Sequence, residues 1–206
     1  MKKIMFNDKY GLTKAVLEGK KTMTRRIIEG EFEKVSVYNA NCNDYFIAET
    51  KDGDNEEIKP RYQVGETVAV AQPYKDAIHP LDWVNKEIYK DTAAWKNKMF
   101  VLPELMPYRI RITDIKLERL QDISNEDAIR EGIFEYDKPP LHHEYDRFAP
   151  WPPYVKPYKH DIDNFKYFCE ARFAFSCLID KIHGKGTWKR NPYVFVYTFE
   201  LINKGE

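Results

Sequence analysis

The sequence predicts one α+β domain over residues 1–206, a small mixed β-barrel with flanking helices and a long loop rich in proline and aromatic residues. Both alternating faces of YVFVYTFELI are largely apolar, which indicates a central strand. In YRIRITDIKLERL the apolar positions change parity near Thr113 and Asp114, which predicts a bulge of the kind that bends a sheet into a barrel. Apolar residues from Phe168 to Ile182 recur at helical spacing before GKG, which predicts an amphipathic helix.

The first expected element is a short helix over residues 7–18. Asp8 is a possible N-cap, and Leu12 and Val16 share one face. Gly19 is placed to end this helix in a left-handed conformation, which glycine adopts without steric cost.

Two short alternating runs follow. The residues Val35 and Val37 alternate in the first run and Tyr45, Ile47 and Glu49 in the second, and the polar stretch NANCND separates the two runs. This pattern predicts a hairpin, and KDGDNEE predicts a second turn after it.

The segment YQVGETVAVAQPY predicts a turn at Gly65 and then a strand. Val68, Val70 and Gln72 point to the same side of that strand. Gln72 is therefore a polar end to an otherwise apolar face.

A helix and a long loop are expected next. Ser124 followed by Asp127 resembles a capping box, and Gly132 is placed to end the helix that it opens. Residues 134–163 contain six of the twelve prolines and show neither helical nor strand periodicity, so we expect an irregular loop insertion there.

Composition limits the classes of function. The chain has 33 Lys and Arg residues and 33 Asp and Glu residues, so its formal net charge is zero. Extensive sequence-independent binding to the backbone of duplex nucleic acid is therefore not expected. No apolar run approaches the roughly 18 residues that cross a bilayer, and MKKIMFNDKYG turns polar too soon for a secretory signal. We therefore expect a cytoplasmic protein with no membrane partner.

Neither a metal nor a cofactor is expected. The chain has three cysteines, an odd number without CxxC pairing, which favours neither a disulfide framework nor a structural zinc site. His142 and His143 are adjacent rather than spaced for one metal ion, and no matching ligand cluster accompanies them.

The segment GKKTMTRR is the clearest candidate site. Around it, five cations fall within thirteen residues against the single acid Glu18: Lys14, Lys20, Lys21, Arg25 and Arg26. A lysine activates a nearby hydroxyl if burial and cationic neighbours lower its pKa, so Lys21 could activate Thr24. The alternative is that Lys21 and the arginines form a solvated basic face that holds a phosphate or a carboxylate.

Three further residues are candidates for ligand contact. Arg109 lies on the strand face opposite Ile110, where it could clamp a phosphate or simply be solvated. Trp188 could stack on a base and Asn191 could read its edge. Alternatively, Trp188 covers the end of the barrel and Asn191 forms a turn with Pro192.

Four segments, in this order and spacing, resemble the ASCH domain family: GKKTMTRR, YQVGETVAVAQ, MPYRIRITDIKLERLQDISNEDAIREGI and GKGTWKRNPYVFVYTFEL. The family pattern GxKxxxxR maps onto Gly19, Lys21 and Arg26, and the chain is similar to the long type seen in bacterial and phage-derived proteins. The resemblance implies a PUA-like barrel that binds RNA or a modified nucleoside in a cleft beside it.

One branch of the small ASCH proteins hydrolyses N4-acetylcytidine, and the resemblance implies a site of Lys, Thr and a Glu at the end of the following strand. Lys21 and Thr24 match the first two, whereas Gln72 stands where related chains usually carry Glu. An amide cannot exchange a proton as a carboxyl can. We therefore expect binding without turnover, and we expect Gln72→Glu to raise deacetylation.

The leading hypothesis is a module that binds RNA or a modified nucleoside or nucleotide in the cleft lined by GxKxxxxR. Its expected ligand-binding residues are Gly19, Lys21, Thr24, Arg25, Arg26, Gln72, Arg109, Trp188 and Asn191. One alternative is an amidohydrolase of N4-acetylcytidine-like substrates, with Lys21 and Thr24 as catalytic residues. Another is a phage-derived protein-interaction domain that uses the aromatic loop 139–158.

Two expectations concern the geometry of this site. Lys21 and Gln72 should approach one cavity from neighbouring strands. Arg26 should be at least partly buried and hydrogen-bonded.

Overall fold

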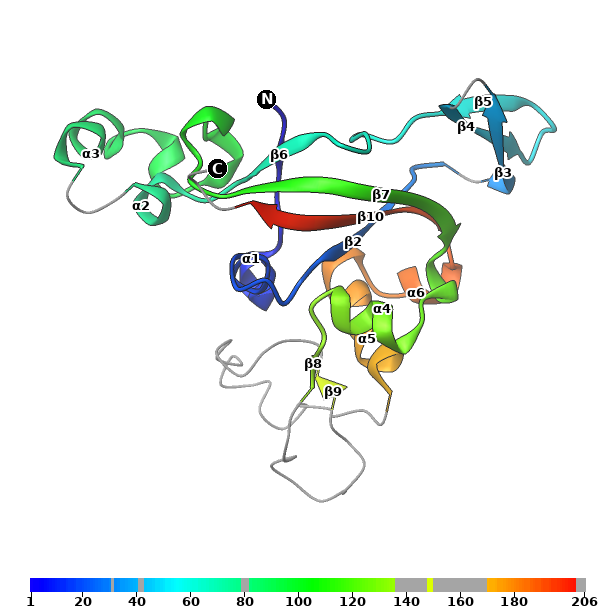
Figure 1. Ribbon diagram of the computed structural model, residues 1–206. Coiled ribbons are helices and arrows are strands. Elements are labelled where there is room, and N and C mark those ends of the chain that lie inside the picture. Colours follow the sequence, from blue (N-terminus) through cyan, green and yellow to red (C-terminus); the bar gives the residue numbers. More distant parts are fainter. Residues whose placement is uncertain (31, 41–42, 79–81, 136–147, 150–169, 203–206) are drawn as a thin grey trace, which may run out of the picture.

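The computed structural model describes the whole chain except residues 31, 41–42, 79–81, 136–147, 150–169 and 203–206 (Figure 1). Its described strands form sheets of five, three and two strands, accompanied by short helices. The expected α+β class is therefore confirmed. None of the described helices is long and apolar enough to cross a membrane.

The five-stranded sheet forms the centre of the molecule and has the strand order β1-β6-β7-β10-β2. β1 pairs with β6 in parallel, and the other pairs are antiparallel. The strands are β1 (Lys3–Ile4), β2 (Met23–Ile27), β6 (Thr67–Val70), β7 (Arg109–Arg119) and β10 (Tyr193–Ile202).

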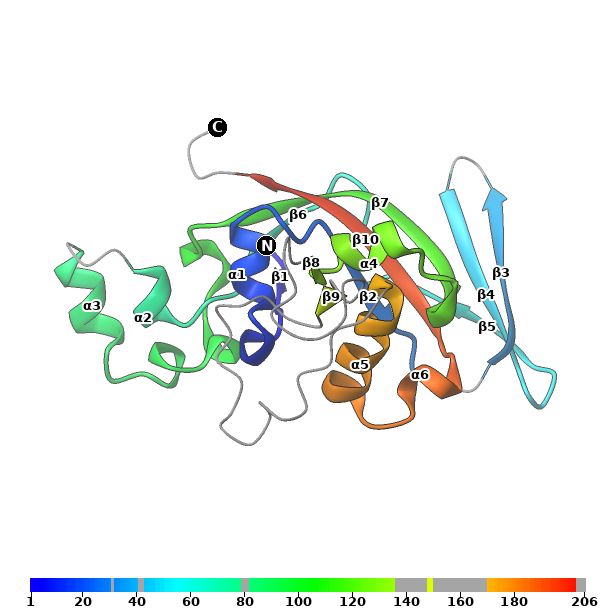
Figure 2. The ribbon, with the colours of Figure 1, turned by 90° about the horizontal axis from the view of Figure 1, so that it is seen from below.

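The two long strands of this sheet match the sequence predictions. β10 lies between β7 and β2, as the apolar character of both its faces predicts. Thr198 pairs with Asp114 and Phe199 pairs with Ile112, so Thr113 is the extra residue of a bulge. Figures 1 and 2 show β7 and β10 as a long curved pair that crosses the molecule.

The two edge strands of this sheet are β1 and β2, and a side chain of β2 contacts the residue that follows β1. Among the described residues no ladder joins them, so barrel closure stays a prediction. Instead, the Arg26 side chain donates a hydrogen bond of 2.8 Å from Nη2 to the carbonyl oxygen of Met5. Arg26 is half-buried, which confirms the expectation that it is partly buried and hydrogen-bonded.

The predicted hairpin and second turn form the three-stranded sheet β3-β4-β5, which projects beside the central sheet (Figure 1). Its strands are β3 (Phe32–Ala40), β4 (Asn43–Thr50) and β5 (Asn55–Ile58). The ring of Phe46 packs edge-on against Phe195 of β10, with 5.0 Å between the ring centroids. This aromatic contact connects the two sheets.

The helix expected over residues 7–18 is divided into two parts. A 3₁₀ turn η1 (Asp8–Tyr10) precedes α1 (Leu12–Leu17), because Gly11 adopts a left-handed φ of 67° between them. The prediction of Asp8 as N-cap is wrong, since the side chain of Asn7 accepts the hydrogen bond from the Lys9 amide. Gly19 has φ 70°, as expected for a glycine that follows a helix.

Three helices follow in the second half of the chain. α4 (Asn125–Arg130) is capped by Ser124, whose hydroxyl accepts a hydrogen bond from the Asp127 amide, as predicted. α5 (Ala171–His183) matches the expected amphipathic helix, although the part of the pattern that begins at Phe168 lies outside the described residues. α6 is Thr187–Arg190. Figures 1 and 2 place α4 and α5 on one face of the central sheet.

A second, smaller core lies in the segment between β6 and β7, for which the sequence predicts no elements. It contains Tyr74, Val101 and Met106. Its elements are α2 (Tyr74–Ala77), α3 (Trp83–Tyr89), η2 (Ala93–Trp95), η3 (Lys98–Phe100) and η4 (Pro103–Leu105).

Three short elements remain. η5 (Leu120–Asp122) follows β7, and β8 (Phe134–Glu135) pairs with β9 (Phe148–Ala149). The last two strands fall within the expected loop 134–163, and the rest of that loop, including most of its aromatic segment, lies outside the described residues.

Candidate functional site

Lys21 lies two residues before the edge strand β2 and is buried. Its Nζ donates hydrogen bonds of 2.6 Å both to Oε2 and to the backbone oxygen of Glu131, which follows α4. Burial lowers the pKa of Lys21, Glu131 acts in the opposite direction, and the charges of Arg26 and Arg25 lower it further. The Lys21 ammonium is therefore hydrogen-bonded to the residue that follows α4, and it is not exposed to solvent.

Arg25 is also buried and is surrounded by carboxylates. Its Nη2 lies 2.6 Å from Oε1 of Glu118 and 3.1 Å from Oδ2 of Asp127, and its Nη1 lies 3.2 Å from Oε1 of Glu131. Burial opposes the charge of Arg25, but Glu131 and Glu118 outweigh it and raise the pKa of Arg25. The interpretation of Lys21 and Arg25 as a solvated basic face is therefore wrong, because both charges are buried and compensated.

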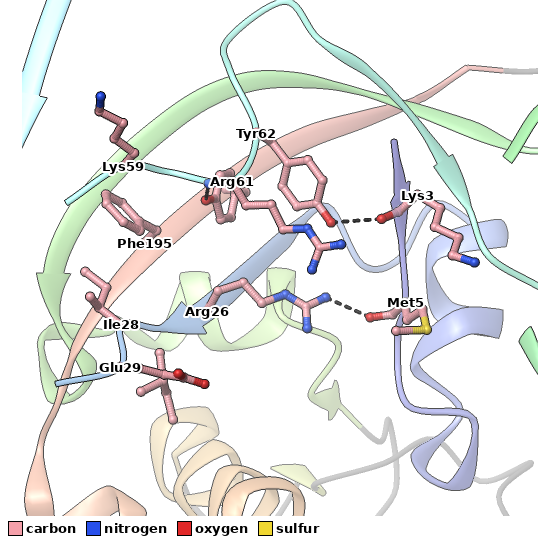
Figure 3. Close-up of a pocket in the computed structure, with 11 residues that line it drawn as sticks. Lys3, Met5, Arg26, Ile28, Glu29, Lys59, Arg61, Tyr62 and Phe195 are labelled. Atoms are coloured by element: carbon pink, nitrogen blue, oxygen red, sulfur yellow. Dashed lines mark hydrogen bonds between the residues drawn. The ribbon is translucent and has the colours of Figure 1, made fainter. Parts of the chain in front are cut away.

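A cavity of about 400 Å³ opens between the central sheet and the two connections that lead into and out of the three-stranded sheet (Figure 3). We call it the arginine cavity. It is lined by Lys3, Met5, Arg26, Ile27, Ile28, Glu29, Lys59, Arg61, Tyr62, Phe195 and Tyr197. Four of these residues are cationic and one is acidic, so the cavity favours an anion.

Arg26 and Arg61 are the two cations whose side chains reach into this cavity side by side (Figure 3). Burial lowers the pKa of Arg26, Tyr62 and Glu131 act in the opposite direction, and the charge of Arg61 lowers it again. Within the described part of the chain, neither guanidinium forms an ion pair with a carboxylate. By contrast, Lys59 is paired with Glu57 at 3.2 Å.

A second cavity, of about 220 Å³, lies at the GxKxxxxR motif, and we call it the lysine cavity. It is lined by Met5, Phe6, Asn7, Leu12, Lys21, Thr24, Arg25, Arg26, Glu131, Phe175, Leu178, Ile179, Ile182 and His183. The structure thus brings together four of the predicted site residues, Lys21, Thr24, Arg25 and Arg26. The sequence analysis missed Glu131 in the lysine cavity, and in the arginine cavity it missed Lys3, Glu29, Lys59 and Arg61.

Gln72 lies elsewhere. It follows β6, which β7 and β10 separate from β2 in the sheet, and it does not line the lysine cavity. The prediction that Lys21 and Gln72 come from neighbouring strands is therefore wrong, and Gln72 lines neither of the two cavities. Gln72 is buried; its backbone N–H contacts Sδ of Met106, and its side-chain Oε1 has no hydrogen-bond partner in the described structure. The carboxylate that contacts Lys21 in the described structure is that of Glu131.

The other predicted ligand residues line neither cavity. Gly19 ends the turn after α1, and Arg109 is exposed on β7. Trp188 packs edge-on against Phe175, and its backbone N–H donates to Asp180 at 2.7 Å.

Asn191 has a structural role like that proposed as its alternative. It adopts a left-handed φ of 49°, and its side-chain oxygen accepts a 2.8 Å hydrogen bond from the Gln121 amide. This supports the turn interpretation of the Asn191-Pro192 step.

Within the residues that the structure describes, no group of three or more His, Cys, Asp or Glu side chains is arranged to hold a metal ion. In comparisons with known proteins, no family model, no curated protein and no solved structure matches this chain.

Proposed function

We propose that this protein binds RNA or a nucleotide, modified or not, and that a phosphate lies between Arg26 and Arg61. The main observation behind this proposal is that the two guanidinium groups line one cavity and that, among the described residues, neither forms an ion pair with a carboxylate. Two like charges held close together repel each other, and an anion between them removes that repulsion. Guanidinium groups also match phosphate geometry through forked hydrogen bonds.

The compensated charges nearby support the same position for the phosphate. Lys21 and Arg25 already contact Glu131, so an anion at either of them would meet a carboxylate. Arg26, the next residue of the motif, has the backbone oxygen of Met5 as its hydrogen-bond partner. Its charge is thus available to a ligand, and Arg61 adds a second charge from the opposite connection.

The resemblance to the ASCH family supports this function, and we propose a PUA-like fold with it. The long curved pair β7 and β10, the bulge at Thr113 and the approach of β1 to β2 through Arg26 are consistent with a sheet that curls into a barrel. Arg26, the last residue of the motif GxKxxxxR, lies on the edge strand β2, and Lys21 lies two residues before that strand.

Arg61→Ala is expected to weaken the binding of uridine 5′-monophosphate and of short single-stranded RNA by roughly 10- to 100-fold, because charge-assisted hydrogen bonds are lost. Arg61→Lys should weaken binding less, since it keeps the charge but not the fork. Titration calorimetry at two salt concentrations measures both, and the loss should shrink at high salt.

Arg109→Ala is the matched control, because Arg109 is exposed, lines neither cavity and carries the same charge as Arg61. It should leave affinity nearly unchanged. Equal losses of affinity for the two variants would mean that only the net charge of the protein matters for binding. The absence of saturable binding to any nucleotide or RNA would contradict the proposed function.

A second candidate function is hydrolysis of an N4-acyl amide of cytidine, in which one water adds across the amide bond to yield cytidine and a carboxylic acid. The specific observation that favours it is that Lys21, Thr24 and a carboxylate, Glu131, line one cavity. Incubation of N4-acetylcytidine with the protein and with Thr24→Val, followed by chromatography, tests it. Release of acetate by the first and not by the second would favour hydrolysis, and no release by either would exclude this substrate.

A further inference from the structure

The arginine cavity and the lysine cavity adjoin each other. Arg26 and Met5 line both, and the hydrogen bond from Arg26 to the Met5 carbonyl lies at their boundary. The Arg26 guanidinium is therefore a group that a ligand in either cavity can contact. Together the two volumes fall within the roughly 300–1,000 Å³ typical of small-ligand sites.

The two cavities differ in charge. In the lysine cavity the Lys21 ammonium and the Arg25 guanidinium both contact Glu131, and Arg25 contacts Glu118 and Asp127 as well. The cations of that cavity other than Arg26 are thus matched by carboxylates. This environment disfavours a second phosphate and suits an uncharged polar group.

The lysine cavity also has apolar walls from two separate elements. Phe6 and Leu12 come from the N-terminal segment, and Phe175, Leu178 and Ile182 come from α5. Apolar and aromatic side chains from two directions can cover both faces of a planar ring. At about 220 Å³, the cavity has room for one ring system rather than an extended chain.

Polar groups in this cavity can contact the edge of such a ring. Thr24, Asn7 and His183 line it together with the aliphatic residues. A hydroxyl and an amide each offer both a donor and an acceptor, which are the groups that read base edges.

We propose that the lysine cavity holds the base of the nucleotide whose phosphate lies between Arg26 and Arg61, so that the ligand is a nucleotide unit with its base removed from solvent. This inference rests on the function proposed above. It predicts that the base, and not the phosphate alone, contributes to affinity. A free nucleoside lacks the arginine contacts, and ribose 5-phosphate lacks the base.

The first test uses the unmodified protein with inorganic phosphate, ribose 5-phosphate, uridine 5′-monophosphate and adenosine 5′-monophosphate as probes in calorimetry. At least one of the two nucleotides should bind about tenfold or more tightly than ribose 5-phosphate, the effect expected for one stacked base. Equal affinities for ribose 5-phosphate and both nucleotides would overturn the inference while leaving the phosphate site intact.

The second test narrows the lysine cavity with Ile182→Trp, at a half-buried position of α5. The variant should weaken nucleotide binding about tenfold and leave ribose 5-phosphate binding unchanged, whereas Arg61→Ala should weaken both. Phe173→Trp, at a residue on the same helix that is 46% exposed, is the size-matched control. Unchanged nucleotide affinity in a folded Ile182→Trp protein would place the base elsewhere, and no binding of any phosphorylated probe would overturn the proposed function as well.

Discussion

Glu131→Gln should lower the free energy of unfolding by about 3–5 kcal/mol, the range observed when one partner of a buried ion pair is removed. The carboxylate of Glu131 contacts two buried cations, Lys21 at 2.6 Å and Arg25 at 3.2 Å. Glutamine keeps the size of the side chain but supplies no negative charge. Lys21 would then keep the backbone oxygen of residue 131 as an uncharged partner.

The dependence on pH identifies the cause of this loss. Burial lowers the pKa of Lys21, and removing the carboxylate lowers it further. Above the folded pKa of Lys21 the unfolded chain binds more protons than the folded protein, so the stability of the variant should rise with pH in the alkaline range below the ordinary lysine value.

Urea unfolding followed by circular dichroism measures this loss, with Glu126→Gln as the control in α4, the helix that Glu131 follows. Glu126 is exposed, so that variant should differ from the parent by less than about 0.5 kcal/mol. A loss below about 1 kcal/mol for Glu131→Gln would mean that the ion cluster contributes little to stability.

The same cluster explains why the charge pattern of the sequence was only partly informative. A run of cations in a sequence does not show which of them will meet a carboxylate in the fold. Glu131 lies 110 residues after Lys21, at the end of α4, where the local pattern indicates a helix end and nothing of its partner. Arg61 is exposed in a connection without periodicity, so no pattern marks it.

Elements that depend on local periodicity could be predicted well. The bulge at Thr113 follows from a change of parity within one strand, and the helix α5 follows from apolar spacing within one segment. The segment between β6 and β7 forms short helices and 3₁₀ turns of three to seven residues, which are too brief to produce a clear period.

Strand order, in contrast, is a long-range property. The position of Gln72 was inferred from the end of β6, but nothing in the local sequence shows that two strands lie between β6 and β2. Of the residues of GKKTMTRR that were expected at the site, Lys21, Thr24, Arg25 and Arg26 line one cavity, whereas Gly19 does not. The resemblance did not predict which strand neighbours them.

Gln72→Glu should destabilise the protein by about 3 kcal/mol at pH 7, and it should not create a deacetylase. Gln72 is 7% exposed, and its Oε1 already has no hydrogen-bond partner in the described structure. A glutamate there would have its pKa raised by burial, because desolvation disfavours the ionised form. Between the ordinary glutamate pKa and this raised value, the folded protein binds more protons than the unfolded chain, so stability should fall as pH rises.

Unfolding in urea from pH 4 to pH 8 checks this sign, with two controls. Gln63→Glu introduces the same charge at an exposed residue before β6 and should change stability little. Gln72→Leu removes the unpaired oxygen without adding charge and should cost less than about 1 kcal/mol. If Gln72→Glu instead kept its stability at pH 8 and gained hydrolysis of N4-acetylcytidine, Gln72 would have to approach Lys21 and Thr24, although it does not line the lysine cavity.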